Sequence, residues 1–173
     1  MFNKYFPDFY YNRVDLIPID LFLNNNIKLV IFDLDNTLVD FTYRLNPKIK
    51  NWISKLQSHG IKCQILSNSK QEKYVSNIAK KIDLRYICDA KKPNLIGFEK
   101  ILKENNIPKE NIMIIGDQIF TDIVGGKNFG IKTLLVEPIN FIEVPVCLLK
   151  RPMEVPIKIA YHCKRKKLNN FKN

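Results

Sequence analysis

Two aspartates at the end of an apolar stretch pose the first chemical question in this sequence. Residues 28–41 read KLVIFDLDNTLVDF, so Asp33 and Asp35 come directly after Leu29–Phe32. Two carboxylates this close repel each other, and an apolar strand before them removes water that would screen the repulsion. Such a pair is typical of an enzyme active site in which one carboxylate attacks the substrate as a nucleophile and the other donates or accepts a proton.

Similar polar groups follow three further apolar stretches. They are Ser67-Asn68 at the end of residues 62–67, Lys91-Lys92 shortly after residues 85–88, and Gly116-Asp117 at the end of residues 112–116, with Asp122 shortly beyond. In an open parallel sheet, ligands bind outside the carboxyl ends of the strands. We therefore expect these groups to meet at one edge of a sheet.

The expected cluster favours a metal ion and a phosphate. Three carboxylates in one crevice (Asp33, Asp35 and Asp117) need a cation, and oxygen ligands without histidine or thiolate indicate a hard ion, for which Mg²⁺ fits best. The hydroxyl of Ser67 and the ammonium of Lys92 could stabilise the charge of a transferred phosphoryl group. An aspartate can itself attack phosphorus and form an aspartyl-phosphate.

Alternating strand and helix patterns position these groups. Strands are expected over residues 28–33, 62–67, 85–88, 112–116 and 132–136. Helices are expected from Pro47 to just before Gly60, over 70–81, after Pro93-Asn94, and over about 119–128, with shorter ones at 18–23 and from near Pro156. This alternation predicts a parallel sheet with helices on both faces.

The motifs resemble those of a known superfamily. Asp33-Leu34-Asp35-Asn36-Thr37, Ser67, Lys92 and the stretch Gly116–Asp122 are similar, in this order, to the four motifs of the haloacid dehalogenase (HAD) superfamily of phosphohydrolases. The resemblance covers residues 28–136. The sequences IFDLDNTLV, KKP and GDQxxTD most resemble the YqeG-like branch, the HAD-IIIA phosphatases, which is similar to the mitochondrial phosphatidylglycerophosphate phosphatases.

The resemblance implies a role for each matching residue. Asp33 would be the nucleophile and a Mg²⁺ ligand, and Asp35 would be the general acid/base that lends its backbone carbonyl to the metal. Ser67 would bind the phosphoryl oxygens, Lys92 would offset charge near Asp33, and Asp117 would complete the metal site. An acid at position 35 indicates a phosphatase, since phosphoryl-transfer ATPases of the superfamily have threonine there and dehalogenases lack the acid.

The supporting residues implied by the resemblance are Thr37, Asn68, Gly116 and Asp122, the last acting directly behind the ligands or through a metal-bound water.

Simpler explanations remain open for some of the site positions. Asp35 could form an Asx turn, Ser67-Asn68 could cap the next helix, and Asp122 could be a first-turn helix acid. Lys91 competes with Lys92 for the lysine role, although Lys92 precedes the proline as in the family pattern.

The spacing of the motifs leaves no room for a cap domain. Asp35 to Ser67 and Ser67 to Lys92 each hold one expected helix and one strand, whereas a folded insert needs about 50 residues or more. The expected fold is a Rossmann-like three-layer α/β sandwich with a parallel sheet, in spatial order 5-4-1-2-3 counted along the chain. An open site favours a large substrate that itself excludes water: a protein, a nucleic acid or a membrane lipid.

The flanking segments differ from the core in composition. We expect an aromatic-rich N-terminal segment over 1–27, a catalytic core over 28–145 and a basic tail over 146–173, which holds +7 of the formal net charge of +11. The aromatic rings could pack on a sheet edge or lie at a bilayer interface. The tail could be solvated, or it could bind anionic phospholipid or nucleic acid.

Composition sets the remaining bounds. The chain is 46% hydrophobic, and no apolar run approaches the ~20 residues that span a bilayer. The four cysteines share no CxxC spacing, which argues against a zinc site, and the N-terminus lacks the apolar stretch of a signal peptide. We expect a cytoplasmic protein that could associate peripherally with a membrane.

These observations predict a Mg²⁺-dependent phosphomonoester hydrolase that acts through an aspartyl-phosphate, with phosphatidylglycerophosphate as the most specific candidate substrate. The alternatives are a nucleic-acid-end or phosphoprotein phosphatase, or a basic RNA- or ribosome-binding module that retains the fold. The acid at Asp35 argues against the last alternative, because a pure binding module has no need of a proton carrier.

Overall fold

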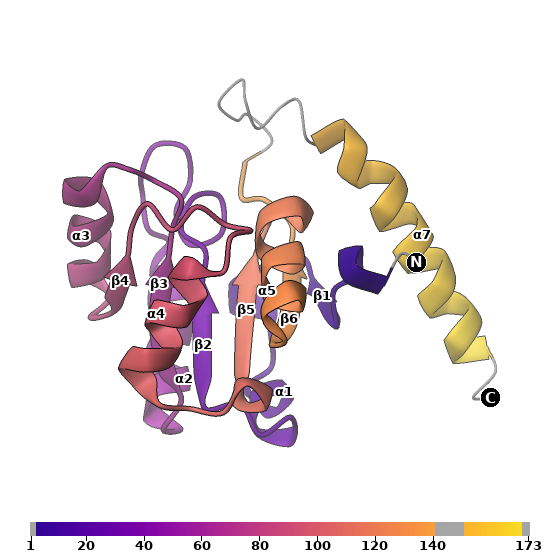
Figure 1. Ribbon diagram of the computed structural model, residues 1–173, viewed down its shortest axis with the longest axis horizontal. Coiled ribbons are helices and arrows are strands. Elements are labelled where there is room, and N and C mark those ends of the chain that lie inside the picture. Colours follow the sequence, from indigo (N-terminus) through magenta and orange to yellow (C-terminus); the bar gives the residue numbers. More distant parts are fainter. Residues whose placement is uncertain (1–2, 141–150, 171–173) are drawn as a thin grey trace.

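A six-stranded parallel sheet organises the computed structural model, which describes residues 3–140 and 151–170 (Figure 1). The strands are β1 (Phe9–Tyr11), β2 (Leu29–Phe32), β3 (Lys62–Leu66), β4 (Arg85–Ile87), β5 (Ile112–Gly116) and β6 (Lys132–Val136). Their spatial order is β1-β6-β5-β2-β3-β4, and every neighbouring pair is parallel. The five predicted strands are therefore confirmed in their predicted order, and the sheet has a sixth strand, β1, that the prediction lacks.

β1 comes from the aromatic N-terminal segment. It pairs with β6, and just before it the Asp8 carboxylate accepts hydrogen bonds from the backbone N–H and the hydroxyl of Thr133, at 2.8 and 3.0 Å. Tyr5 packs edge-to-face on Phe120, with ring centroids 5.9 Å apart. These rings therefore lie against the sheet edge, which is one of the two expected placements. A strand of three residues is too short to show a period, so the sequence pattern does not reveal it.

Helices cover both faces of the sheet. They are α1 (Ile19–Asn24), α2 (Pro47–Ser58), α3 (Glu72–Lys81), α4 (Ile96–Asn105), α5 (Val124–Phe129) and α7 (Arg151–Asn170), with short turns η1 (Asn3–Tyr5), η2 (Val14–Leu16), η3 (Lys109–Asn111) and η4 (Ile119–Ile123). The Asn46 side chain accepts a hydrogen bond from Lys48 N–H and caps α2, as predicted. The helix predicted over 119–128 is present, but it opens with η4 as a π-helical turn.

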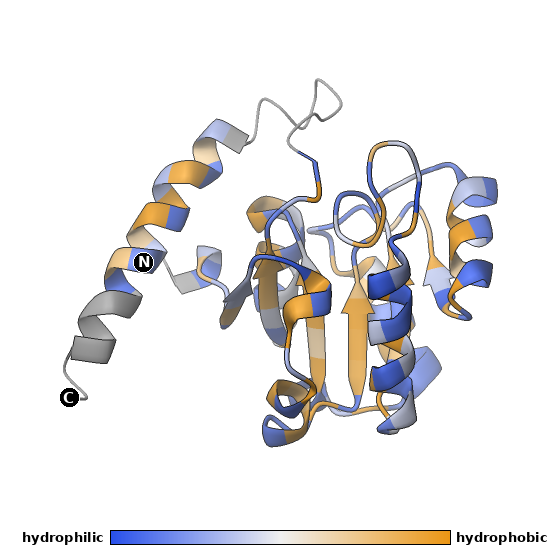
Figure 2. Ribbon diagram, turned by 180° about the vertical axis from the view of Figure 1, so that it is seen from behind, coloured by the Kyte–Doolittle hydropathy of each residue, from blue (hydrophilic) through white to orange (hydrophobic). Residues whose placement is uncertain are grey.

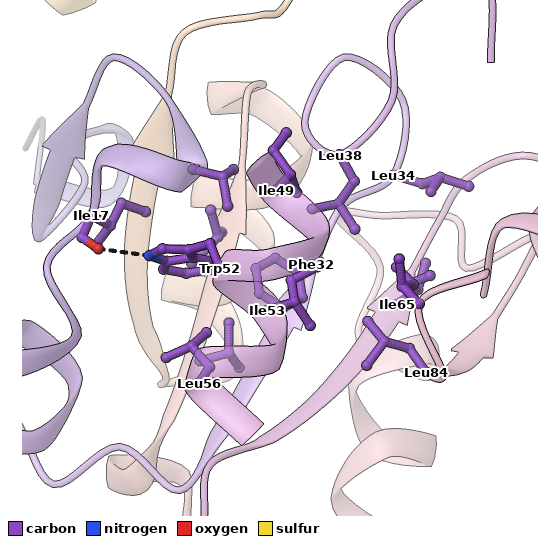
Figure 3. Close-up of a cluster of buried hydrophobic side chains, with 14 of the residues drawn as sticks. Ile17, Phe32, Leu34, Leu38, Ile49, Trp52, Ile53, Leu56, Ile65 and Leu84 are labelled. Carbon is purple, nitrogen blue, oxygen red and sulfur yellow. Dashed lines mark hydrogen bonds between the residues drawn. The ribbon is translucent and has the colours of Figure 1, made fainter. Parts of the chain in front are cut away.

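Alternate residues of the central strands divide the core into two layers. Val30 and Phe32 of β2 pack with α1, α2 and α3, whereas Leu29 and Ile31 pack with α4 and α5. In the first layer, the Trp52 indole N–H donates a hydrogen bond to the Ile17 carbonyl at 2.8 Å (Figure 3). The central strands appear as nearly continuous hydrophobic ribbons between the helices (Figure 2). This arrangement confirms the predicted three-layer sandwich.

The chain between the motifs adds no further folded unit. Residues 36–66 contain α2 and β3, and residues 68–91 contain α3 and β4, so this described part of the chain carries no cap domain, as predicted. No helix in the described residues is long and apolar enough to cross a membrane.

The tail helix α7 begins at Arg151, five residues before the Pro156 start that the sequence indicates. It lies beyond β1 at the edge of the sheet (Figure 1). Ile157 packs, as Tyr5 and Tyr10 do, against the buried cluster of Ile119, Ile123 and Leu135. The Tyr161 ring lies 5.9 Å from that of Phe6. Residues 146–150 and 171–173 of the predicted tail, with Cys147, lie outside the described residues.

Candidate active site

Three aspartates gather at the carboxyl edge of the sheet. Asp33 follows β2, Asp117 follows β5, and Asp122 lies in η4; each offers a carboxylate oxygen within 4.8 Å of the others. All three are buried. The backbone N–H of Asp33 donates to the Ile115 carbonyl at 2.9 Å, so the β2–β5 ladder continues up to the first aspartate and fixes its position.

The Lys92 ammonium lies between two of these carboxylates. Its Nζ donates to Asp33 Oδ1 at 2.6 Å and to Asp122 Oδ1 at 2.7 Å, and its side chain is only 1% exposed. Burial lowers the pKa of Lys92, but the charges of Asp122 and Asp33 outweigh burial and raise the pKa above its usual value. Lys91 is instead exposed and lies 3.8 Å from Asp89. The structure thus brings Lys92, and not Lys91, to the cluster.

The loop after β3 holds the Lys92 backbone. Asn68 Oδ1 accepts from the Lys92 N–H at 2.6 Å, and Asn68 Nδ2 donates to the Lys92 carbonyl at 3.1 Å. The buried Ser67 hydroxyl oxygen accepts from Ser69 N–H at 3.0 Å. The alternative that Ser67-Asn68 caps the next helix is wrong, because α3 begins only at Glu72 and its N-cap residue is Gln71.

Asp122 is fixed at both carboxylate oxygens. Oδ1 accepts from Lys92, and Oδ2 accepts from the Gln118 backbone N–H at 3.1 Å. It is thus a first-turn acid of η4 and a member of the cluster at once. Burial raises the pKa of Asp122 to about 6, against the lowering effect of Lys92. A Cβ atom on Gly116 would lie 2.3 Å from this carboxyl group, so only glycine leaves room for it.

Thr37 joins the first and fourth motifs. Its hydroxyl lies 3.3 Å from both Asp33 Oδ2 and Asp117 Oδ1, and the residue is buried. The chain turns back toward the site at Asn36, whose φ of 60° lies in the left-handed region that asparagine tolerates better than most residues.

The Asp35 carboxylate points to a different partner. Its Oδ1 accepts a hydrogen bond from the Tyr74 hydroxyl of α3 at 2.6 Å. Burial raises the pKa of Asp35, the Tyr74 hydrogen bond opposes this, and the Asp33 charge adds to the rise. The Tyr43 ring of the loop between β2 and α2 packs on Tyr74 with centroids 4.5 Å apart. Sequence analysis misses Tyr74, since its partner lies 39 residues away and no local pattern marks it.

The cluster suits a hard divalent cation. Three buried carboxylates face one buried ammonium, so the group carries excess negative charge in a place with little water to screen it. The ligand atoms that Asp33, Asp117 and Asp122 offer are all carboxylate oxygens, and Mg²⁺ prefers oxygen ligands. Of the predicted ligands, Asp33 and Asp117 contribute carboxylates to this group, whereas Asp35 could contribute only its backbone carbonyl.

The sequence is similar to those of known phosphatases. A family model described as HAD-hydrolase-like matches residues 90–138. Over 141 residues the chain is 33% identical to "Probable phosphatase YqeG" of Bacillus subtilis (strain 168), with 80% of this chain and 81% of that protein covered. It is 26% identical over 154 residues to "Phosphatidylglycerophosphate phosphatase 1, chloroplastic/mitochondrial" of Arabidopsis thaliana, with 78% of this chain and 44% of that protein covered.

Solved structures show the same fold. A protein from Listeria monocytogenes serotype 4b aligns with a TM-score of 0.56 at 19% identity, covering 69% of this chain and 85% of that one. The cobalt-bound deoxy-D-mannose-octulosonate 8-phosphate phosphatase of Haemophilus influenzae aligns with a TM-score of 0.54 at 16% identity, covering 65% of this chain and 69% of that one. At these identities the likeness concerns the fold alone.

Proposed function

The chain belongs to the HAD superfamily of hydrolases and is a phosphatase, and from this we propose that it hydrolyses phosphomonoesters with Mg²⁺ through an aspartyl-phosphate on Asp33. The observation that carries the proposal is the contact of the Lys92 ammonium with Asp33 and Asp122 beside Asp117. A buried carboxylate with a fixed cation next to it has the surroundings that attack on a phosphate dianion requires.

The proposed reaction has two steps. An Asp33 carboxylate oxygen attacks phosphorus, the bond from phosphorus to the ester oxygen breaks, and the protonated Asp35 gives its proton to that oxygen. In the second step the Asp35 carboxylate takes a proton from a water molecule, and the resulting hydroxide attacks the acyl-phosphate. Inorganic phosphate leaves, and Asp33 and the proton on Asp35 are restored. The raised pKa of Asp35 suits a group that must be protonated in the first step.

The remaining residues would bind the phosphoryl group and the metal. Lys92 and the Ser67 hydroxyl would contact phosphoryl oxygens. The carboxylates of Asp33 and Asp117, with the backbone carbonyl of Asp35, would hold Mg²⁺. When bound, the metal supplies positive charge between these carboxylates and the phosphate.

Thr37, Asn68, Gly116 and Asp122 would support the site without contacting phosphorus. Their observed contacts suggest how: Asn68 holds the Lys92 backbone, Asp122 holds its ammonium, Gly116 leaves space for Asp122, and Thr37 spans Asp33 and Asp117.

We also propose a phospholipid monoester, with phosphatidylglycerophosphate the leading candidate, as the substrate class. The site has no cap domain in the described residues 36–66 and 68–91, so a large substrate would have to exclude water itself. The likeness to a phosphatidylglycerophosphate phosphatase supports this choice. We further propose that residues 28–145 are the catalytic core, with 1–27 and 146–173 as flanking segments, in a cytoplasmic protein that works at the membrane surface.

Hydrolysis of p-nitrophenyl phosphate tests the proposed chemistry. We expect wild-type turnover that requires Mg²⁺ and stops with EDTA, and we expect Asp33→Asn to abolish turnover, because a carboxamide cannot form the acyl-phosphate. Asp20→Asn in α1 is the matched control, an exposed aspartate away from the site, and should keep full activity. Wild-type protein that is inert with Mg²⁺ on lipid, sugar, nucleotide and aryl phosphates would refute the proposal.

A further inference from the structure

Between Pro152 and Cys163, the tail helix α7 turns its two charged residues, Glu154 and Lys158, toward the protein and exposes most of its apolar residues. Four residues spaced three or four apart, Glu154, Ile157, Lys158 and Tyr161, form the face that touches the core. Glu154 accepts a hydrogen bond from the Ile119 N–H at 2.8 Å, and Lys158 donates to Glu137 at 2.9 Å. Glu154 and Lys158 therefore both bind to the core and hold the helix against it.

Between Pro152 and Cys163, where the structure describes the side chains, the opposite side of α7 is apolar. We call it the outward face; it consists of Pro152, Val155, Pro156, Ile159, Ala160 and Cys163, all exposed. Val155 and Ile159 are 52% and 58% exposed, and Met153 beside them is 62% exposed. In Figure 2, hydrophobic residues follow one another along α7, which stands clear of the helices that cover the sheet. A surface helix normally has the reverse arrangement, with apolar residues toward the core.

The charge around the outward face indicates what covers it. The helix begins at Arg151, directly after Lys150 in the sequence, and continues through Lys164-Arg165-Lys166-Lys167. Residues 146–173 carry a net charge of +7. Two copies of such a helix would repel each other. Nucleic acid would match the charge but would gain little from contact with isoleucine, valine and proline. An apolar helix face flanked by basic residues suits the boundary between anionic headgroups and acyl chains.

We propose that the outward face of α7 docks on the surface of an anionic bilayer. The docking would hold the active site next to the membrane, because Ile119, which α7 contacts through Glu154, begins the η4 turn that contains Asp122. The inference rests on the proposed function only for the identity of the substrate; binding to the bilayer stands on α7 itself.

Vesicle co-sedimentation with the full chain tests this docking. The vesicles contain phosphatidylcholine alone or with about one third phosphatidylglycerol, and the variant is Val155→Gln/Ile159→Gln. We expect the variant to bind the anionic vesicles about tenfold more weakly than wild type, because it lacks two aliphatic side chains that the bilayer would partly bury. The matched control is Leu16→Gln in η2, a residue 56% exposed, which should bind like wild type. Wild type should bind phosphatidylcholine alone poorly, and salt should weaken its binding to the anionic vesicles.

Three further measurements make the result decisive. Melting curves should coincide for all three proteins, since the substituted side chains are exposed. Turnover of p-nitrophenyl phosphate without vesicles should be equal, so that a failure of the phosphatase proposal is seen separately from a failure of docking. Equal vesicle binding by wild type and the double variant, or no binding by wild type, overturns the inference. A wild-type dimer that the double variant converts to a monomer also overturns it and makes the outward face an interface between copies.

Discussion

Asp35 has two carboxyl oxygens in different surroundings. Oδ1 accepts a hydrogen bond from the Tyr74 hydroxyl at 2.6 Å. A carboxylic acid that accepts a hydrogen bond at one oxygen carries its own proton on the other, so Tyr74 would direct the transferable proton of Asp35 to Oδ2. Tyr74 therefore acts through Asp35 as a positioning residue and needs no contact with the substrate.

Tyr74→Phe should separate good from poor leaving groups. An alkyl phosphate needs its ester oxygen protonated as the bond to phosphorus breaks, whereas p-nitrophenolate leaves without help. We expect kcat/KM for an alkyl phosphate to fall about tenfold, the value of one hydrogen bond, and kcat/KM for p-nitrophenyl phosphate to change little. Tyr43→Phe is the control, because it removes a hydroxyl from the ring that packs on Tyr74. An equal loss for both esters would show that Tyr74 is only structural.

At the scale of single elements, η4 links α7 to the site. It is a π-helical turn with Asp122 in it, and its first N–H, at Ile119, donates to the buried Glu154 of α7. A helix N-terminus needs acceptors for its unpaired N–H groups, and here one acceptor comes from a segment 35 residues further along the chain. The position of η4 therefore depends on α7 being docked.

Glu154→Ala should weaken both the fold and the site. It leaves the Ile119 N–H buried without its acceptor, which costs about 1–3 kcal/mol in the free energy of unfolding. We expect a melting temperature lower by several degrees and reduced turnover of p-nitrophenyl phosphate. Glu154→Gln keeps a carbonyl oxygen for the same N–H and should restore most of both losses. Identical melting curves for wild type and Glu154→Ala would contradict the proposed link.

At the scale of the whole molecule, α7 completes the edge of the sheet. It covers β1 and the residues just before it through ring contacts of Tyr10 with His162 and of Phe6 with Tyr161, at 4.8 and 5.9 Å between centroids. The sequence leaves open whether this tail packs on the core or lies on a partner. In the structure one face packs on the core, and the opposite face is exposed.

Cutting the chain after Pro145 should therefore destabilise the protein as well as remove vesicle binding. The truncation exposes the rings of Tyr5 and Tyr10 and leaves Ile119 without Glu154. We expect a clearly lower melting temperature, measured by circular dichroism, together with weaker turnover of soluble esters. The double variant Val155→Gln/Ile159→Gln is the comparison, since it should lose vesicle binding alone. A truncated protein with an unchanged melting curve would show that α7 contributes nothing to the fold.

The parts of the fold that sequence predicts are those with a local signal. Apolar strands such as Leu29–Phe32 and a capped helix at Asn46-Pro47 carry their pattern within a few residues, and motif order then places Asp33, Lys92 and Asp117 at one edge. The roles of these residues stay predictions. β1 cannot be predicted from the sequence, because a strand of three residues has no measurable period. The role of Tyr74 cannot be predicted either, because a tyrosine hydroxyl can donate a hydrogen bond to any acceptor that the fold brings near.

The two edges of the sheet are both strands of three residues, β1 and β4. An edge strand offers unpaired backbone groups on which another chain can add a strand, and the hazard grows with its length and flatness. Here β1 is short and has α7 beside it, and β4 begins with the exposed and charged Arg85. A protein crowded at high local concentration on a bilayer meets its own copies often. These short edges would limit strand-to-strand aggregation under that condition, while the longer strands β2, β3, β5 and β6 stay inside the sheet.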